Sequence, residues 1–157
     1  MAGESMIAAL QSQRPKLVER RNSEIAPAQD ELRVGIGNLE VLLKAERTEL
    51  SSEVGALRKT TEERKALTLA IDGSGPGLAS QLTNGLDVLK LREAEEEKRV
   101  RERQRRIPKL EAQLTSAKAL LEKLDAEFNQ VSEDIAELDK RIEKLREASA
   151  AISDRSA

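Results

Sequence analysis

The side chains able to do acid–base or metal chemistry in this chain are carboxylates, amines and guanidiniums. Its 157 residues include 29 Asp and Glu and 27 Lys and Arg, but neither Cys nor His. The sequence therefore lacks a thiol nucleophile, an imidazole base, and thiolate or imidazole metal ligands. Paired carboxylates support hydrolysis only where they converge in a dry cleft. We predict a protein that is not an enzyme, with no catalytic residue, no metal site and no cofactor.

Residues 72–77 form the densest glycine cluster, a composition that can cradle phosphate groups. A phosphate-binding loop of that kind needs Lys and then Ser or Thr after its last glycine. In this chain Leu78 and Ala79 follow Gly77 instead. The cluster is rich enough in Gly and Pro to reverse the chain, so we predict an apical turn.

Residues 98–106 are the most basic stretch and suggest binding to a nucleic acid. Glu102 is interleaved with the basic residues, and the stretch has no aromatic side chain on which a base could stack. The formal net charge of the whole chain is -2, which gives no strong field for a polyanion. We expect a solvated helix face and keep nucleic-acid binding as an alternative.

An apolar heptad pattern organises the second half of the chain. From Ile107 onward apolar residues recur at alternating steps of three and four, which predicts a coiled-coil seam. The same phase extends back to Leu82, but it also places Glu93, Glu96 and Arg103 on the seam. The apolar part of this predicted seam contains Ile107, Leu110, Leu114, Ala117, Leu121, Leu124, Phe128, Val131, Ile135, Leu138, Ile142, Leu145 and Ile152.

The first half of the chain repeats this pattern less regularly. A second seam runs from Leu32 to Leu57, with Glu46 among its members. Two arms of similar length joined by a short turn favour an antiparallel pair, in which residue i faces roughly residue 148 minus i. Leu17 is then expected opposite Val131.

We therefore predict an all-α fold, a long antiparallel helical hairpin that forms a coiled coil. A proline inside a helix removes one hydrogen bond and clashes with the preceding turn, so kinks are expected at Pro15, Pro27 and Pro108. The whole chain, 1–157, is predicted to be a single elongated coiled-coil domain. Its parts are a proline-interrupted helical segment at 1–26, a first long helix at 27–71, the apical turn at 72–77, and a second long helix at 78–153.

No run of about 18 apolar residues predicts a membrane span, and the first ten residues lack the basic flank of a signal peptide. We expect a cytoplasmic protein with protein partners and no small-molecule substrate. Homo-oligomerisation remains open.

The apex of the predicted hairpin is more apolar than two helix ends require. Clustered exposed apolar surface marks partner sites. The candidate partner-binding residues are Leu69, Ile71, Leu78, Leu82 and Leu86. An alternative is that these residues close the end of the helix pair, or form a small bundle in a homo-oligomer.

A charged helix that follows a glycine-containing apex and carries Leu91, Arg92, Glu93 and Glu95 resembles one known family. These are the stalk proteins of type III secretion and flagellar export ATPases. The resemblance implies a helical hairpin that inserts into a hexameric ATPase and contacts the export machinery. The expected function is thus a non-enzymatic interaction or scaffold protein, with a stalk of a secretion ATPase as its specific form. A structural homo-oligomeric coiled coil and a nucleic-acid-binding helix protein using 98–106 are the alternatives.

Overall fold

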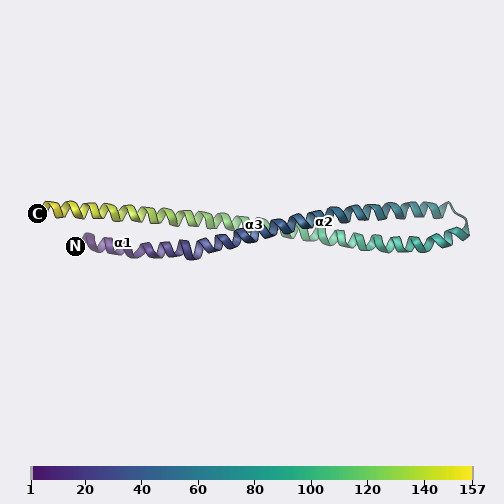
Figure 1. Ribbon diagram of the computed structural model, residues 1–157, viewed down its shortest axis with the longest axis horizontal. Helices are drawn as coiled ribbons and strands as arrows, with labels where there is room; N and C mark the ends of the chain where they lie inside the picture. Colours follow the sequence, from purple (N-terminus) through teal and green to yellow (C-terminus); the bar gives the residue numbers. More distant parts are fainter. Residues whose placement is uncertain (1, 157) are drawn as a thin grey trace. The chain divides into compact units, whose positions relative to one another are not determined.

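The computed structural model describes residues 2–156, and in this part of the chain every regular element is a helix. The elements in order are α1 (Ala2–Glu19), the π-helix η1 (Arg20–Ile25), α2 (Ala26–Asp72) and α3 (Pro76–Ser156). The first three follow one another without a break, and α3 returns antiparallel to them (Figure 1). The predicted all-α antiparallel hairpin is confirmed.

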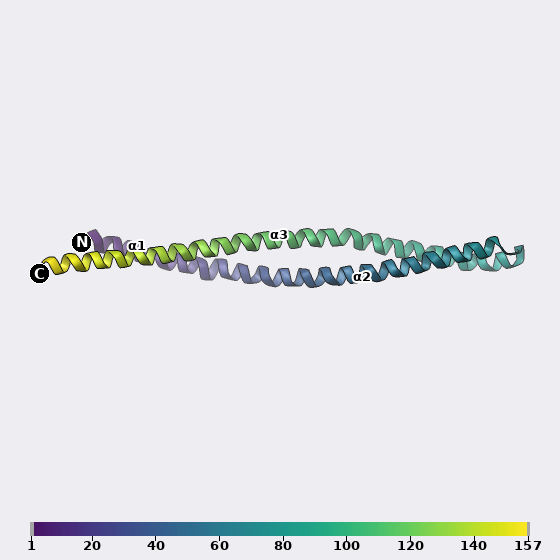
Figure 2. The same cartoon turned by 90° about the horizontal axis from the view of Figure 1, so that it is seen from above.

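The hairpin divides into two compact units. Unit 1 comprises residues 1–37 and 116–157, and unit 2 comprises residues 38–115. Within each unit, two helical segments of opposite direction lie side by side (Figures 1 and 2). Unit 1 pairs α1, η1 and the start of α2 with the end of α3, and unit 2 holds the turn.

The predicted heptad phase on α3 is the phase that is buried. Val131, Ile135, Leu138 and Ile142 are at most 7% exposed, and the seam residues before them are buried or half-buried. In unit 1 the centre of this packing is Ile25 with Val131 and Ile135. Leu17, Val18 and Phe128 pack against that centre, so Leu17 lies at the cluster that contains both Val131 and Ile135.

The register of the pair differs by about one helical turn from the 148 minus i rule. A Cβ atom placed on Gly3 would lie 3.3 Å from Ser149 Oγ, whereas the rule puts Leu145 there. At the other end of the chain's two arms, a Cβ on Gly85 would lie 3.6 Å from Leu67, which the rule pairs with Gln81. The rule assumed that the chain reverses symmetrically about residue 74. The observed pairs are instead symmetric about residue 76.

The three internal prolines do not end the helices. Pro15 lies inside α1 and Pro108 inside α3. Pro27 follows η1, where Ala26 N–H donates to the carbonyl of Arg21, five residues back. A proline at 27 cannot donate to Ser23 and its ring crowds that carbonyl. The wider π turn before it accommodates this crowding, as π segments in helices commonly do at such local disruptions.

The apical turn uses three of the six residues in the 72–77 cluster, since α2 ends at Asp72 and α3 begins at Pro76. Gly73 N–H donates to Leu69 O at 3.1 Å, Ser74 N–H donates to Ile71 O at 3.1 Å, and the Ser74 hydroxyl donates to Ala70 O, so three of the last four carbonyls of α2 are satisfied. Pro76 is the first residue of α3, where a missing N–H costs little because the first turn of a helix has no intrahelical acceptor for it. No glycine in the described chain has a positive φ.

Candidate protein-interaction site

The five residues proposed for partner binding divide into two groups. Leu69 is 73% exposed and Leu78 is 54% exposed, so both side chains face solvent. Ile71, Leu82 and Leu86 are half-buried and continue the seam phases of α2 and α3. The same end of the hairpin also exposes Val88 and Leu91. We call residues 69–91 the apical segment, and its exposed apolar side chains are Leu69, Leu78, Val88 and Leu91.

The half-buried members hold the two arms together. A Cβ on Gly85 would meet Leu67 across the pair, which shows that the arms are in van der Waals range one residue before Leu86. The phase of Leu82 and Leu86 is the seam phase predicted for α3. We therefore assign Leu82, Leu86 and Ile71 to packing, whereas Leu69 and Leu78 are exposed and take no part in it.

Charged residues occupy the seam of unit 2. Arg103 donates to Glu46 Oε2 at 2.9 Å and binds Glu53 through two bonds of 2.9 and 2.8 Å. The side chains of Arg103 and Glu46 are only 21% and 11% exposed. The hydrogen bond with Glu53, followed by the negative charges of Glu53 and Glu46, raises the pKa of Arg103, against an opposing effect of burial. Arg103 therefore stays charged at every physiological pH.

Two further polar contacts continue this seam toward the turn. Thr60 donates to Glu96 Oε1 at 3.0 Å, and Arg64 forms an ion pair with Glu93. The other carboxylate oxygen of Glu96, Oε2, is buried and has no hydrogen-bond partner among residues 2–156. Glu93, Glu96 and Arg103, the three charged residues that the heptad phase placed on the seam, are thus all at the helix interface.

The basic stretch 98–106 is partly committed to contacts inside the protein. Arg103 is bound as described, Arg106 lies 3.5 Å from Glu46, and Arg101 pairs with Glu97 at 3.2 Å. Val100 is buried in the seam. A nucleic acid would have to compete with carboxylates for these guanidiniums, so the stretch offers less positive charge than its composition suggests.

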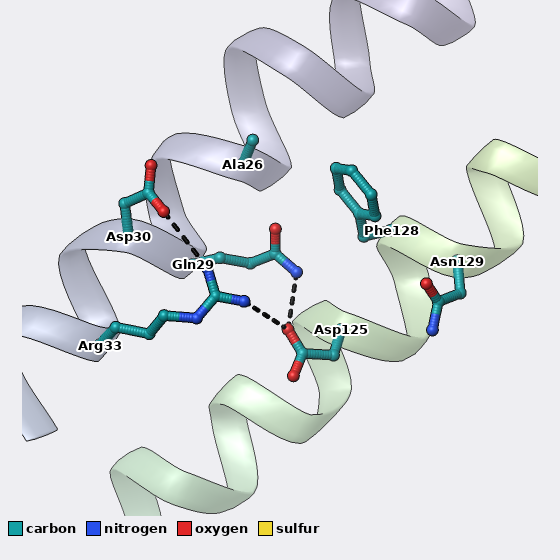
Figure 3. Close-up of a pocket in the computed structure, with 7 residues that line it drawn as sticks. All are labelled: Ala26, Gln29, Asp30, Arg33, Asp125, Phe128 and Asn129. Atoms are coloured by element: carbon teal, nitrogen blue, oxygen red, sulfur yellow. Dashed lines mark hydrogen bonds and ion pairs between the residues drawn. The ribbon is translucent and has the colours of Figure 1, made fainter.

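A polar hollow of about 500 Å³ lies in unit 1 (Figure 3). Asp125 Oδ1 accepts from Gln29 Nε2 at 2.7 Å, and Arg33 lies 3.5 Å away. Arg33 also pairs with Asp30, and Phe128 and Asn129 stand on the α3 side. Arg33 pairs with both carboxylates, and Gln29 and Arg33 of α2 both reach Asp125 of α3, so we assign these contacts to holding α2 against α3.

Residues 2–156 contain no group of three or more Asp or Glu arranged to hold a metal ion. None of the helices described is both long and apolar enough to cross a lipid bilayer. Comparison of the chain with protein-family models, with curated proteins and with solved structures finds no match.

Proposed function

We propose that this protein is a non-enzymatic coiled-coil hairpin that binds a protein partner through its apical segment. The observation that carries the proposal is the exposure of large apolar side chains at Leu69 and Leu78. Neither residue is used by the helix interface, and each leucine buried on binding would contribute about 1.5–3 kcal/mol. A partner with an apolar surface is the ligand that such side chains favour.

The carboxylates support the non-enzymatic part of the proposal. Those that reach the interior, such as Glu46 and Glu53, are bound by Arg103. The oxygens of these two carboxylates are occupied by guanidinium hydrogen bonds inside the helix interface, which leaves them poorly placed to reach a substrate.

The experiment is site-specific photo-crosslinking in the source cells, with a photoreactive amino acid at position 78 and, as the control position, at 41. We expect one protein to crosslink at 78 and not at 41, because Val41 is even more exposed than Leu78 but lies outside the apical segment. Leu69→Ser with Leu78→Ser should reduce recovery of that protein by at least about tenfold, because roughly 1.4 kcal/mol corresponds to a tenfold change. Helicity by circular dichroism should stay unchanged.

Val41→Ser is the matched control and should leave partner recovery unaltered. Full recovery of the partner by the double leucine variant would contradict the proposal. Unfolding of that variant would place the two leucines in the core and contradict it equally.

The more specific form of the proposal is that the partner is a hexameric ATPase of a secretion machine. Its support is the helix, glycine turn and helix order, with Leu91, Arg92 and Glu95 exposed on α3. Glu93 of the same motif is instead engaged with Arg64 in the seam. Identification of the protein crosslinked at position 78 by mass spectrometry tests this form separately, because any other protein would exclude it while leaving apical binding intact.

A further inference from the structure

The two sides of the unit 1 hairpin are chemically different. On one side, polar bonds join the arms, with Arg14 bound to Asp139 at 2.8 Å and Arg33 near Asp125. The opposite side carries an apolar groove of about 270 Å³. The apolar groove is lined by Ala28, Glu31, Leu32, Gly35 and Ile36 of α2 and by Ala117, Leu120 and Leu124 of α3.

The heptad positions of these residues place the polar bonds and the apolar groove on opposite sides of the seam. Arg33 and Asp125 each follow a seam residue, whereas Gly35 and Leu120 each precede one. Those are the e and g positions, which flank a coiled-coil seam on its two sides and usually carry charge. In the apolar groove the g positions are small or apolar instead.

The hairpin itself does not require glycine at position 35. A Cβ atom there would meet nothing within 4 Å, and a glycine inside a helix costs up to about 1 kcal/mol relative to alanine. Leu120, across the apolar groove, is 49% exposed. Together they leave room for the close approach of another helix over an apolar floor.

The rims of the apolar groove carry opposite charges. Glu31 stands on the α2 rim, and Lys123 lies one turn from Leu120 on the α3 rim. Both are exposed, and neither has an ion-pair partner among residues 2–156. Gln29 and Arg33 both reach Asp125, so Glu31 and Lys123 are at nearly the same level of the pair.

This charge pattern selects one arrangement of a second copy. A two-fold axis parallel to the helices places α2 of one copy over α3 of the other at the same level. Glu31 then faces Lys123 of the second copy, and the pair occurs twice. A two-fold axis perpendicular to the helices would instead bring Glu31 against Glu31 and Lys123 against Lys123.

We propose that the apolar groove is the interface for a second copy of this chain, packed parallel to the first with two-fold symmetry. The product is a four-helix bundle over unit 1, in which the groove floors meet around Gly35 and Leu120. Four-helix bundles bury seams of this kind between layers of two helices. The apical segment plays no part in this contact.

The oligomeric state of the full chain tests the proposal, measured by sedimentation velocity at about 1–100 µM. We expect the mass of two chains for the natural sequence. Leu120→Lys should shift the protein to one chain, because it places charge on the groove floor, while Val41→Lys, outside the groove, should leave the dimer intact. Gly35→Gln is a second test variant. The single hairpin has room for this side chain and glutamine favours a helix more than glycine does, but the side chain would fill the apolar groove and should weaken the dimer.

Charge exchange tests the orientation. Glu31→Lys alone and Lys123→Glu alone should each weaken self-association by about fivefold to tenfold, since two exposed pairs become repulsive. The double variant Glu31→Lys with Lys123→Glu should restore it. A natural chain that remains a monomer at about 100 µM, or a dimer insensitive to both Leu120→Lys and Gly35→Gln, would overturn the proposal. Failure of the double variant to recover would overturn the parallel arrangement.

Discussion

Arg103 binds two carboxylates in the helix interface, Glu53 and Glu46, and among residues 2–156 Glu46 has only Arg106, at 3.5 Å, as a second cation. Glu46 and Glu53 are each less than one-fifth exposed, and removal of the guanidinium would leave both charges largely desolvated. Breaking a buried ion pair on one side is strongly destabilising, whereas replacing the whole group with apolar residues is often neutral or favourable. Loss of Arg103 alone should therefore destabilise the helix pair, whereas replacing Arg103, Glu46 and Glu53 together with apolar residues should not.

We expect Arg103→Leu to lower the melting temperature by several degrees. The triple variant Glu46→Leu, Glu53→Leu, Arg103→Leu should recover that loss and melt at or above the natural chain. Thermal unfolding followed by circular dichroism makes the comparison. A single variant as stable as the natural chain would mean that water solvates the two carboxylates.

The positions of these charged residues were predictable, but their partners were not. The heptad phase alone put Glu93, Glu96, Arg103 and Glu46 at the interface. Which carboxylate meets which guanidinium depends on the register, and the register depends on how the turn starts α3. The apical residues show the same limit, because a count of leucines near the turn cannot separate exposed Leu69 from half-buried Ile71.

Within the helices, the prolines differ in whether the missing N–H costs a backbone hydrogen bond. Pro108 lies deep in α3 and is exposed, with buried Ile107 beside it. Its ring leaves the carbonyl of Gln104 without the usual helical donor. Pro76 begins α3, where no such bond exists to lose.

Pro108→Ala should therefore raise the free energy of unfolding by about 1–3 kcal/mol. Pro76→Ala is the matched control and should give no gain. Urea unfolding of both variants provides the measurement. Equal stability of Pro108→Ala and the natural chain would mean that the helix effectively restarts at this residue.

The sequence predicted disruption at Pro27, and the structure shows its form. Six residues of π-helix precede this proline in place of a break. Helix propensity and hydrophobic periodicity distinguish an α-helix from a strand or a loop. They do not distinguish an α-helical turn from a π-helical one, so the sequence did not predict η1. The apolar groove also escaped prediction, although glycine at a g position beside apolar neighbours is a signal that a search of the flanking heptad positions would have found.

For the molecule as a whole, the hairpin makes a direct prediction about covalent crosslinks. Leu17→Cys with Ile135→Cys should form a disulfide within one chain, since both side chains belong to one packed cluster and the chain has no other cysteine. The observed register predicts faster closure for this pair than for Leu17→Cys with Val131→Cys. Leu17→Cys with Leu121→Cys should not close, because its members lie several turns apart.

Non-reducing electrophoresis at low protein concentration separates intramolecular from intermolecular products. Crosslinks found only between chains would show that α1 pairs with α3 of another molecule. Faster closure at 131 than at 135 would contradict the register.

The polar seam of unit 2 also determines which motions are open to it. Heptad pairs can in principle slide past one another by seven residues, since one leucine then replaces another. Here such a displacement would set Arg64 against Leu86 or Val100 in place of Glu93, and would strip Glu96 of Thr60. Register shifts of this kind transmit signals along some helix pairs. A register shift in unit 2 would therefore cost these polar contacts, so the partner proposed for the apical segment would act on unit 2 by rotation or by local separation of the two helices.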